Sequence, residues 1–238
     1  MRSRAIGFLL LLIAWPAGAQ TSLTFARIPG IPDQFVGSKL LEAIYARLDI
    51  KAEFLDVPAN RALSMSSAGE LDGEVLRILD VAQQYETLLP VKPAINYIEP
   101  TAFSKRLQFE TSGWQSIAQY RVGIVRGVGS SERGTKDMPQ VEPVTSIDTL
   151  FNMLDGDRLD VIVNDLFGGR LVAKKLGMDQ EVHPLLPPFE HLAVYHFLNV
   201  KHRDLLPKVE AIVREMEASG ELAQLRRSIE QQMLDAKD

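Results

Sequence analysis

The sequence predicts an α/β protein made of two units, each a mostly parallel sheet covered by helices. Three observations support this fold class. Strand-like and helix-like segments alternate from residue 23 onward, the same alternation restarts after residue 104, and two helical segments close the chain. This alternation is typical of parallel sheets because a helix usually forms the crossover between parallel strands.

The first unit opens at residues 23–28, where apolar and polar side chains alternate as in a half-buried strand. Turn residues at 29–33 break the strand, and apolar residues at helical spacing follow at Leu40, Leu41, Ile44 and Leu48. The next elements expected are a strand at 52–55, a helix at 61–68 ended by Gly69, and a strand at 71–78.

The second unit follows an extended segment at 95–104 and begins with a strand at 121–125. A helix is expected at 145–155, where Thr145 and Asp148 have the spacing of a capping box. A buried strand at 159–164, a helix at 166–176 closed by Gly177 and a short strand at 181–185 complete the unit. Trp114 and Tyr120 are expected to pack within it.

Pro187 and Pro188 mark the end of the second unit. An extended segment at 192–200 and helices at 205–219 and 222–233, separated by Gly220, then close the chain. This order predicts that residues 20–98 and 195–238 form one lobe and residues 104–190 the other. The chain would cross between the lobes at 99–103 and 191–194, which form a hinge.

The head of the chain has the three parts of a secretory signal peptide. Arg2 and Arg4 precede an apolar run at 5–15, and Ala17 and Ala19 form an Ala-x-Ala ending. We expect cleavage after Ala19, a periplasmic location, and a mature chain of 219 residues with a charge of −7, because the leader carries two of the basic residues. The apolar run is too short to span a bilayer, and no later stretch approaches its length.

The composition excludes several functional classes. The acidic balance disfavours nucleic acid as a partner. With no cysteine in the chain, disulfides and thiolate chemistry are absent. The four histidines do not have metal-ligand spacing, so we expect no metal. The Gly-x-Gly at 127–129 lacks the third glycine of a dinucleotide site, and we expect no cofactor. We expect a monomer whose partner is a small molecule.

Several segments resemble the bacterial extracellular solute-binding proteins of family 3, the amino-acid-type periplasmic binding proteins. The matching segments are the opening strand with its helix, 61–77, 121–127, 154–165 and 200–222. A Gly-Glu-Leu-Asp or Gly-Asp-Arg-Leu-Asp sequence occurs once in each lobe. The resemblance implies a type II periplasmic binding protein fold, with mixed sheets joined by a two-strand hinge and a ligand cleft between the lobes. It also implies an ABC permease or a membrane sensor as partner.

Two departures from the family pattern indicate that the chain resembles a divergent branch of that group. The family usually has an arginine about a dozen residues after the first-lobe aspartate, but residues 80–86 contain none. Arg77 instead lies five residues after Asp72. The loop after the first strand is short, and its only aromatic residue is Phe35.

Arg77 is the strongest candidate for ligand binding, since it lies at the end of an apolar strand and its guanidinium suits a carboxylate. The alternative is an arginine that extends from the strand end to solvent, or one that forms an ion pair with Glu74 or Asp80. In a regular strand, Glu74 and Arg77 would face opposite sides. Glu74 could therefore bind a ligand amine only if the strand ends by Leu76, and is otherwise solvated or paired with an arginine. Arg61 begins a helix near the cleft edge, with a surface position as its alternative.

The second lobe supplies the other candidates. Gly127, Gly129 and Ser130 follow a strand and open a helix, where free N–H groups attract anions. In the resembled family this loop holds the ligand carboxylate; a plain turn is the alternative. The family places an acid at Asp165 that meets the ligand ammonium, and a helix N-cap is the competing role. Asp72 and Asp160 are interpreted as structural residues that accept backbone N–H bonds.

The leading hypothesis is a periplasmic protein that captures a small polar, carboxylate-bearing, amino-acid-like solute in an interlobe cleft, for an ABC-type importer or sensor. One alternative is a periplasmic dehydratase of cyclic carboxylic acids on the same fold, in which Glu74 or Asp165 acts as general acid near Arg77. The other is a ligand-sensing module without a transport role. Tyr97 and Tyr195, in the expected crossings, could stack on a ligand or pack the hinge.

Overall fold

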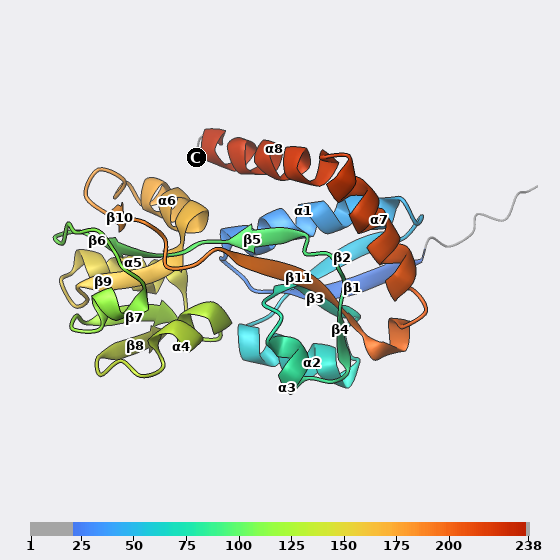
Figure 1. Ribbon diagram of the computed structural model, residues 1–238, viewed down its shortest axis with the longest axis horizontal. Coiled ribbons are helices and arrows are strands. Elements are labelled where there is room, and N and C mark those ends of the chain that lie inside the picture. The colour runs from blue at the N-terminus through green and yellow to red at the C-terminus, as the bar shows by residue number, and fades with distance from the viewer. Residues whose placement is uncertain (1–20, 237–238) are drawn as a thin grey trace, which may run out of the picture.

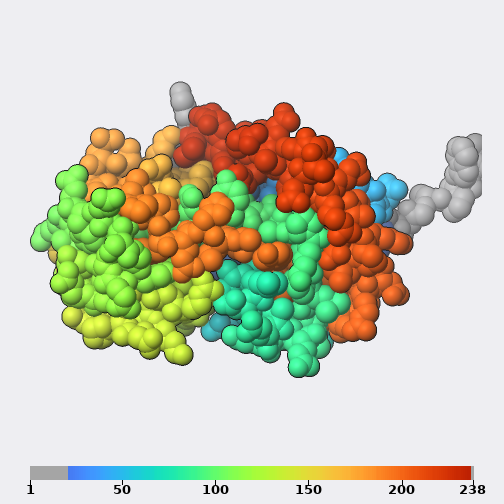
Figure 2. Space-filling view, viewed as in Figure 1, coloured from blue at the N-terminus to red at the C-terminus, as the bar shows by residue number. Residues whose placement is uncertain are grey.

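The computed structural model describes residues 21–236, so the expected signal peptide lies outside the described residues. Two lobes lie side by side, each with one sheet between helices (Figure 1). The space-filling view shows the lobes in contact, with the C-terminal helices, in red, along one side of the boundary (Figure 2). None of the helices in the described range is long and apolar enough to cross a membrane.

The first lobe contains a six-stranded sheet in the order β2-β1-β3-β11-β4, with β5 pairing β11. β1 pairs β2 and β3 in parallel, whereas β11 is antiparallel to its neighbours. The strands are β1 (Ser22–Arg27), β2 (Lys51–Asp56), β3 (Gly73–Arg77), β4 (Leu88–Pro90), β5 (Asn96–Ile98) and β11 (Leu192–Asn199). The helices are α1 (Pro32–Ala46), α2 (Ala59–Ala68), α3 (Val81–Gln84), α7 (Leu206–Ala218) and α8 (Glu221–Asp235), with a 3-10 turn at Val200–His202.

The second lobe contains a five-stranded sheet in the order β10-β6-β9-β7-β8. β7 pairs β8 and β9 in parallel, and β6 runs antiparallel to β9 and β10. The strands are β6 (Pro100–Ser104), β7 (Val122–Val125), β8 (Val141–Val144), β9 (Val161–Asp165) and β10 (His183–Leu185). The helices are α4 (Gly129–Thr135), α5 (Ile147–Asp155) and α6 (Leu166–Lys175), with a 3-10 turn at Trp114–Ile117.

The first crossing between the lobes is shorter than the sequence predicted, and the second lies earlier in the chain and ends before residues 192–194, which belong to β11. β5 pairs with residues 192–194 at the start of β11, and β6 begins at Pro100, so Glu99 alone separates the two strands of the first crossing. Residues 100–103, expected in the hinge, belong to the second sheet, where they pair with β9. The second crossing runs through residues 186–191, between β10 and β11.

Apolar side chains of β1 and β3 pack against α1, α7 and α8 and form the core of the first lobe. Two clusters cover opposite faces of the second sheet, and Trp114 and Tyr120 pack in one of them, as predicted. The predicted capping box at Thr145 and Asp148 is wrong. Ser146 is the N-cap of α5, because its extended backbone lets its hydroxyl accept a bond from the Thr149 N–H.

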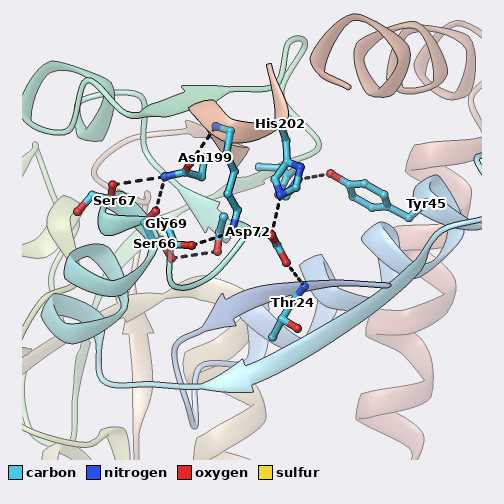
Figure 3. Close-up of polar contacts among 11 residues, drawn as sticks. Thr24, Tyr45, Ser66, Ser67, Gly69, Asp72, Asn199 and His202 are labelled. Carbon is cyan, nitrogen blue, oxygen red and sulfur yellow. Dashed lines mark hydrogen bonds and ion pairs between the residues drawn. The ribbon is translucent and has the colours of Figure 1, made fainter. Parts of the chain in front are cut away.

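Asp72 and Asp160 have the structural role that their positions predicted. Asp72 Oδ2 accepts a hydrogen bond from the N–H of Thr24 in β1 (2.7 Å), and Oδ1 accepts one from His202 Nε2 (2.6 Å; Figure 3). Asp160 Oδ2 accepts the N–H of Arg121 (2.9 Å), just before β7. Each aspartate therefore fixes the start of a central strand of its own sheet.

His196 joins three elements of the first lobe through buried hydrogen bonds. Its Nδ1 lies 2.7 Å from the carbonyl oxygen of Glu74 in β3, and its Nε2 lies 2.8 Å from the hydroxyl of Tyr45 in α1. A carbonyl can only accept, so Nδ1 carries the proton and Nε2 accepts from the tyrosine. Complete burial lowers the pKa of His196 to about 4, and the neutral ring is part of the core.

Candidate functional site

A cavity of about 460 Å³ lies between the two lobes. The carboxyl ends of β1, β3, β7 and β9 all lead to it, which is where open α/β sheets place their ligands. Arg77 from the first lobe and Gly127, Gly129, Ser130 and Asp165 from the second line this cavity. The structure thus brings five of the seven predicted site residues to one place.

Glu74 and Arg77 form a buried ion pair instead of facing opposite sides of β3. The Arg77 Nη2 and Nε atoms lie 2.7 and 2.8 Å from Glu74 Oε2. The alternative of an ion pair with Glu74 is thus the one that the structure shows, and the opposite-face condition does not apply because β3 is not a regular strand at this point. Its pairing with β1 stops at Glu74, and the register with β11 shifts between Tyr195 and Phe197.

The pair leaves part of the guanidinium of Arg77 free toward the cavity. Nη2 also donates to the carbonyl of Ala59 (3.1 Å), and within residues 21–236 no hydrogen bond to Nη1 is formed. Glu74 is 1% exposed and does not line the cavity. Burial raises the pKa of Glu74, and the charge of Arg77 opposes that shift. Glu74 therefore positions Arg77, and it does not have the cavity access that a general acid of the dehydratase alternative needs.

The segment from β7 into α4 supplies the second wall of the cavity. Gly127 has φ +81° and lies against α2 of the other lobe, where an added Cβ would be 2.5 Å from Ala59 Cβ. The Gly127 N–H donates to Glu132 Oε1 (2.7 Å). The prediction that this amide is free to bind an anion is therefore wrong. Gly129 and Ser130 begin α4, and no side chain caps the helix at Val128.

Asp165 has the N-cap role that was one of its two predicted roles, and its position at the cavity leaves ligand binding as a prediction. Its Oδ2 accepts the N–H of Gly168 (3.1 Å) as the N-cap of α6, and its Oδ1 accepts the N–H of Glu99 in the first crossing (2.6 Å). The same carboxyl group lines the cavity. Burial raises the pKa of Asp165, although the backbone N–H bonds act against this shift.

Asp33 is a cavity residue that the sequence analysis missed. It lies in the first turn of α1, is 6% exposed, and reaches the cavity from the first lobe. Burial first and the charge of Asp165 second hold the pKa of Asp33 well above its usual range. Acids are common in the first turn of a helix, where they interact favourably with the helix dipole. Nothing in the sequence pattern therefore distinguished Asp33 from such an acid.

Arg133 was also missed, because it lies in a short helix with no apolar period. From α4 it donates to Asp80 Oδ2 of the first lobe (2.8 Å) and to Glu190 Oε2 of the second crossing (2.9 Å). Both side chains of the Arg133–Asp80 pair are partly exposed, at 39% and 47%. This ion pair joins the two lobes at the rim of the cavity.

Arg61 lies on the exposed side of α2 and does not line the cavity, so its surface alternative fits the structure; the neighbouring Asn60 lines the cavity instead. On another side of the hinge, the Tyr97 ring packs against the tilted ring of His191 and under the guanidinium of Arg226. Tyr195 packs near Phe197 and also lies outside the cavity lining. Within the described part of the chain, no three His, Cys, Asp or Glu residues are grouped so that they could hold a metal ion.

No protein-family model matches the chain. Among curated proteins, an uncharacterized protein of Shewanella oneidensis strain MR-1 is 23% identical over 192 residues, which are 76% of this chain and 72% of that protein.

Solved structures provide stronger likenesses. An ancestral arginine-binding protein bound to arginine has a TM-score of 0.74 at 16% identity, covering 87% of this chain and 97% of its own. AbpA of Streptococcus pneumoniae, an amino-acid ABC transporter substrate-binding protein bound to L-arginine, has a TM-score of 0.74 at 14% identity, covering 90% and 97%. A histidine kinase sensor domain with similarity to periplasmic binding proteins has a TM-score of 0.71 at 13% identity, covering 88% and 96%. The chain thus has the type II periplasmic binding protein fold that its sequence predicted.

Proposed function

We propose that the protein is a periplasmic solute-binding protein that captures a small polar solute bearing a carboxylate, and that an ABC-type importer or a membrane sensor recognises its closed form. The observation that carries the proposal is the interlobe cavity, where buried Arg77 and Asp33 of the first lobe meet half-buried Asp165 of the second. Solved neighbours include importer components and a sensor domain, and both kinds of partner fit the proposal.

Arg77 is the group proposed to bind the solute carboxylate. Its ion pair with Glu74 and its bond to the Ala59 carbonyl fix the guanidinium before a ligand arrives, so little conformational entropy is lost on binding. Nη1 then donates to the carboxylate in a setting largely shielded from water, where a charge-assisted hydrogen bond is strong. Asp165, on the opposite lobe, is proposed to accept a bond from a solute ammonium.

Binding would be coupled to lobe closure. Arg77 belongs to the first lobe and Asp165 to the second, so a solute that touches both stabilises the closed arrangement over the open one. The hinge for this motion consists of Glu99 and residues 186–191. The rim contacts of Gly127 with Ala59 and of Arg133 with Asp80 form only when the lobes meet.

The proposal is tested first by a thermal-shift screen of L-amino acids, organic acids, polyamines and sugars, with L-arginine and L-glutamine included because an ancestral arginine-binding protein has been solved with each. A ligand at 100 times its Kd stabilises the folded state by about 2.7 kcal/mol, which a melting curve detects readily. The compound that raises Tm most is then titrated by calorimetry. A complete screen without a shift would contradict the proposal.

The calorimetric titration compares wild type with the double variant Glu74→Gln plus Arg77→Gln. Replacing both residues avoids leaving one buried charge unpaired. We expect binding to weaken at least ~30-fold, because loss of a buried charged partner costs about 2–5 kcal/mol. The control is Arg121→Gln, which removes an exposed arginine paired with Asp160 outside the cavity. If the double variant binds as tightly as the control, Arg77 does not hold the solute.

A further inference from the structure

The acids Asp33, which is buried, and Asp165, which is half-buried, meet across the boundary between the lobes. Asp165 Oδ2 accepts the N–H of Gly168 (3.1 Å), and a Cβ added to that same glycine would lie 3.2 Å from Asp33 Oδ2. The two carboxyl groups therefore approach one backbone position of α6, one from each lobe. Both also line the same cavity.

Asp33 has no cationic partner in this position. No side-chain hydrogen bond or ion pair links it to a basic group among residues 21–236, although its exposure is only 6%. Asp165 satisfies its oxygens with two backbone N–H groups. Two carboxylates that share a buried space cannot both stay ionised at low cost, so one of them retains a proton.

We propose that Asp33 and Asp165 form an interlobe carboxyl pair that holds one shared proton when the lobes are closed, so that closure of the empty cleft takes up a proton. At neutral pH, where two ionised carboxylates would face each other, the pair opposes closure of the empty protein. This inference deepens the proposed function, because it assigns a control of closure to the same cleft. It rests on lobe closure and requires no particular solute.

Other charged groups near the pair do not neutralise it. From α8, Glu230 adds a further negative charge that acts on Asp33 and Asp165, and Arg226 and Arg227 of the same helix act on Glu230. From the crossings, Glu99 acts on Asp165, and His191 lies 3.3 Å from Glu99 Oε1. From β3, Arg77 is engaged by Glu74.

The direction of the pH effect follows from burial and charge. In the closed arrangement, burial and the neighbouring carboxylate raise the pKa of Asp33 well above its ordinary value, and burial raises that of Asp165. In an open arrangement each carboxyl faces water and titrates nearer its ordinary value. The closed form therefore binds a proton that the open form has released, and acidification favours closure. The closed-to-open ratio changes about tenfold for each pKa unit gained on closing.

The experiment measures closure of the ligand-free protein against pH by interlobe energy transfer. The chain has no cysteine, so dyes can be placed on Lys51→Cys in the first lobe and Glu142→Cys in the second, both exposed. As the pH is lowered from 7.5 to 5, we expect the energy-transfer efficiency to shift reversibly toward the value of the closed form. Asp33→Asn, which replaces the shared proton with an amide, should be closed at both pH values.

Two further variants complete the design. Asp165→Asn keeps an N-cap residue on α6 and should also lose the pH response. Asp137→Asn, an exposed aspartate of the second lobe, should respond as wild type does. The inference fails if wild type shows no change with pH, or if both Asn variants at the pair keep the wild-type response. Neither result would affect the proposed solute binding, because no solute is present.

Discussion

Gly127 offers a direct perturbation of lobe closure, because it touches the opposite lobe with no side chain of its own. A Cβ at this position would lie 2.5 Å from Ala59 Cβ, whereas ordinary contact begins at 3.4 Å. Gly127→Ala must therefore separate the lobes by about 0.9 Å at this point. The φ of +81° also strains an alanine, but this strain is present in the open and closed forms alike.

The size of the effect follows from the steric clash. Overpacking of a tight contact costs about 1–3 kcal/mol, and here that cost falls on the closed form alone. Because the bound state is the closed state, affinity for the best compound of the thermal-shift screen should fall by roughly 5- to 150-fold. Calorimetry measures this loss, and urea unfolding reports the separate cost of backbone strain.

Gly177→Ala is the matched control. Gly177 has a similar φ of +69°, but an added Cβ would meet no atom within 4 Å. We expect this variant to lose stability by about 1 kcal/mol and to bind the compound as wild type does. If Gly127→Ala bound as tightly as Gly177→Ala, closure onto Ala59 would not be part of binding and the reasoning would be refuted.

Three further predictions concern single residues. Folding depends on neutral His196, whose pKa of about 4 lies below the 6.5 of the unfolded chain, so its contribution is complete above pH 6.5 and is lost as pH falls toward 4. Between pH 7 and pH 4.5 the loss is about 2.5 kcal/mol, and urea unfolding at these two pH values should show it in wild type but not in His196→Gln. Arg133→Ala should weaken calorimetric binding of the screened compound by less than about fivefold, because its ion pair with Asp80 is partly exposed; a loss above a hundredfold would instead indicate a direct solute contact. Asp72→Ala should lower the unfolding free energy by about 1–3 kcal/mol while binding stays unchanged, and altered binding would contradict its structural role.

Much of the fold could be predicted because its signals are local. Alternating apolar residues mark β1, and Gly69 ends α2 with a left-handed φ of +80°. Pro187 and Pro188 lie in the return crossing, directly after the last strand of the second lobe. The hinge limits were less accurate, since residues 100–103 are extended in either case and only their pairing with β9 assigns them to the second lobe.

Only those cavity residues that lie directly at the end of a strand could be predicted from the sequence. Arg77, Asp165 and the start of α4 lie at the carboxyl ends of strands, and that rule leads them to the cavity. The contact of Glu74 with Arg77 depends on an irregular register between β3 and β11, which strand parity does not indicate. The raised pKa of Asp33 comes from burial and from the charge of Asp165, which lies more than a hundred positions away in the sequence. No local sequence pattern indicates this contact.

The central claim is that one solute binds between the two lobes and touches both. Hydrogen–deuterium exchange, with and without the best compound of the thermal-shift screen, tests this claim most directly. We predict added protection at the end of β3, at the β7–α4 segment and at the start of α6 in the same experiment, because all three line the cavity. Protection confined to one lobe, or to surfaces outside the cavity, would contradict the account.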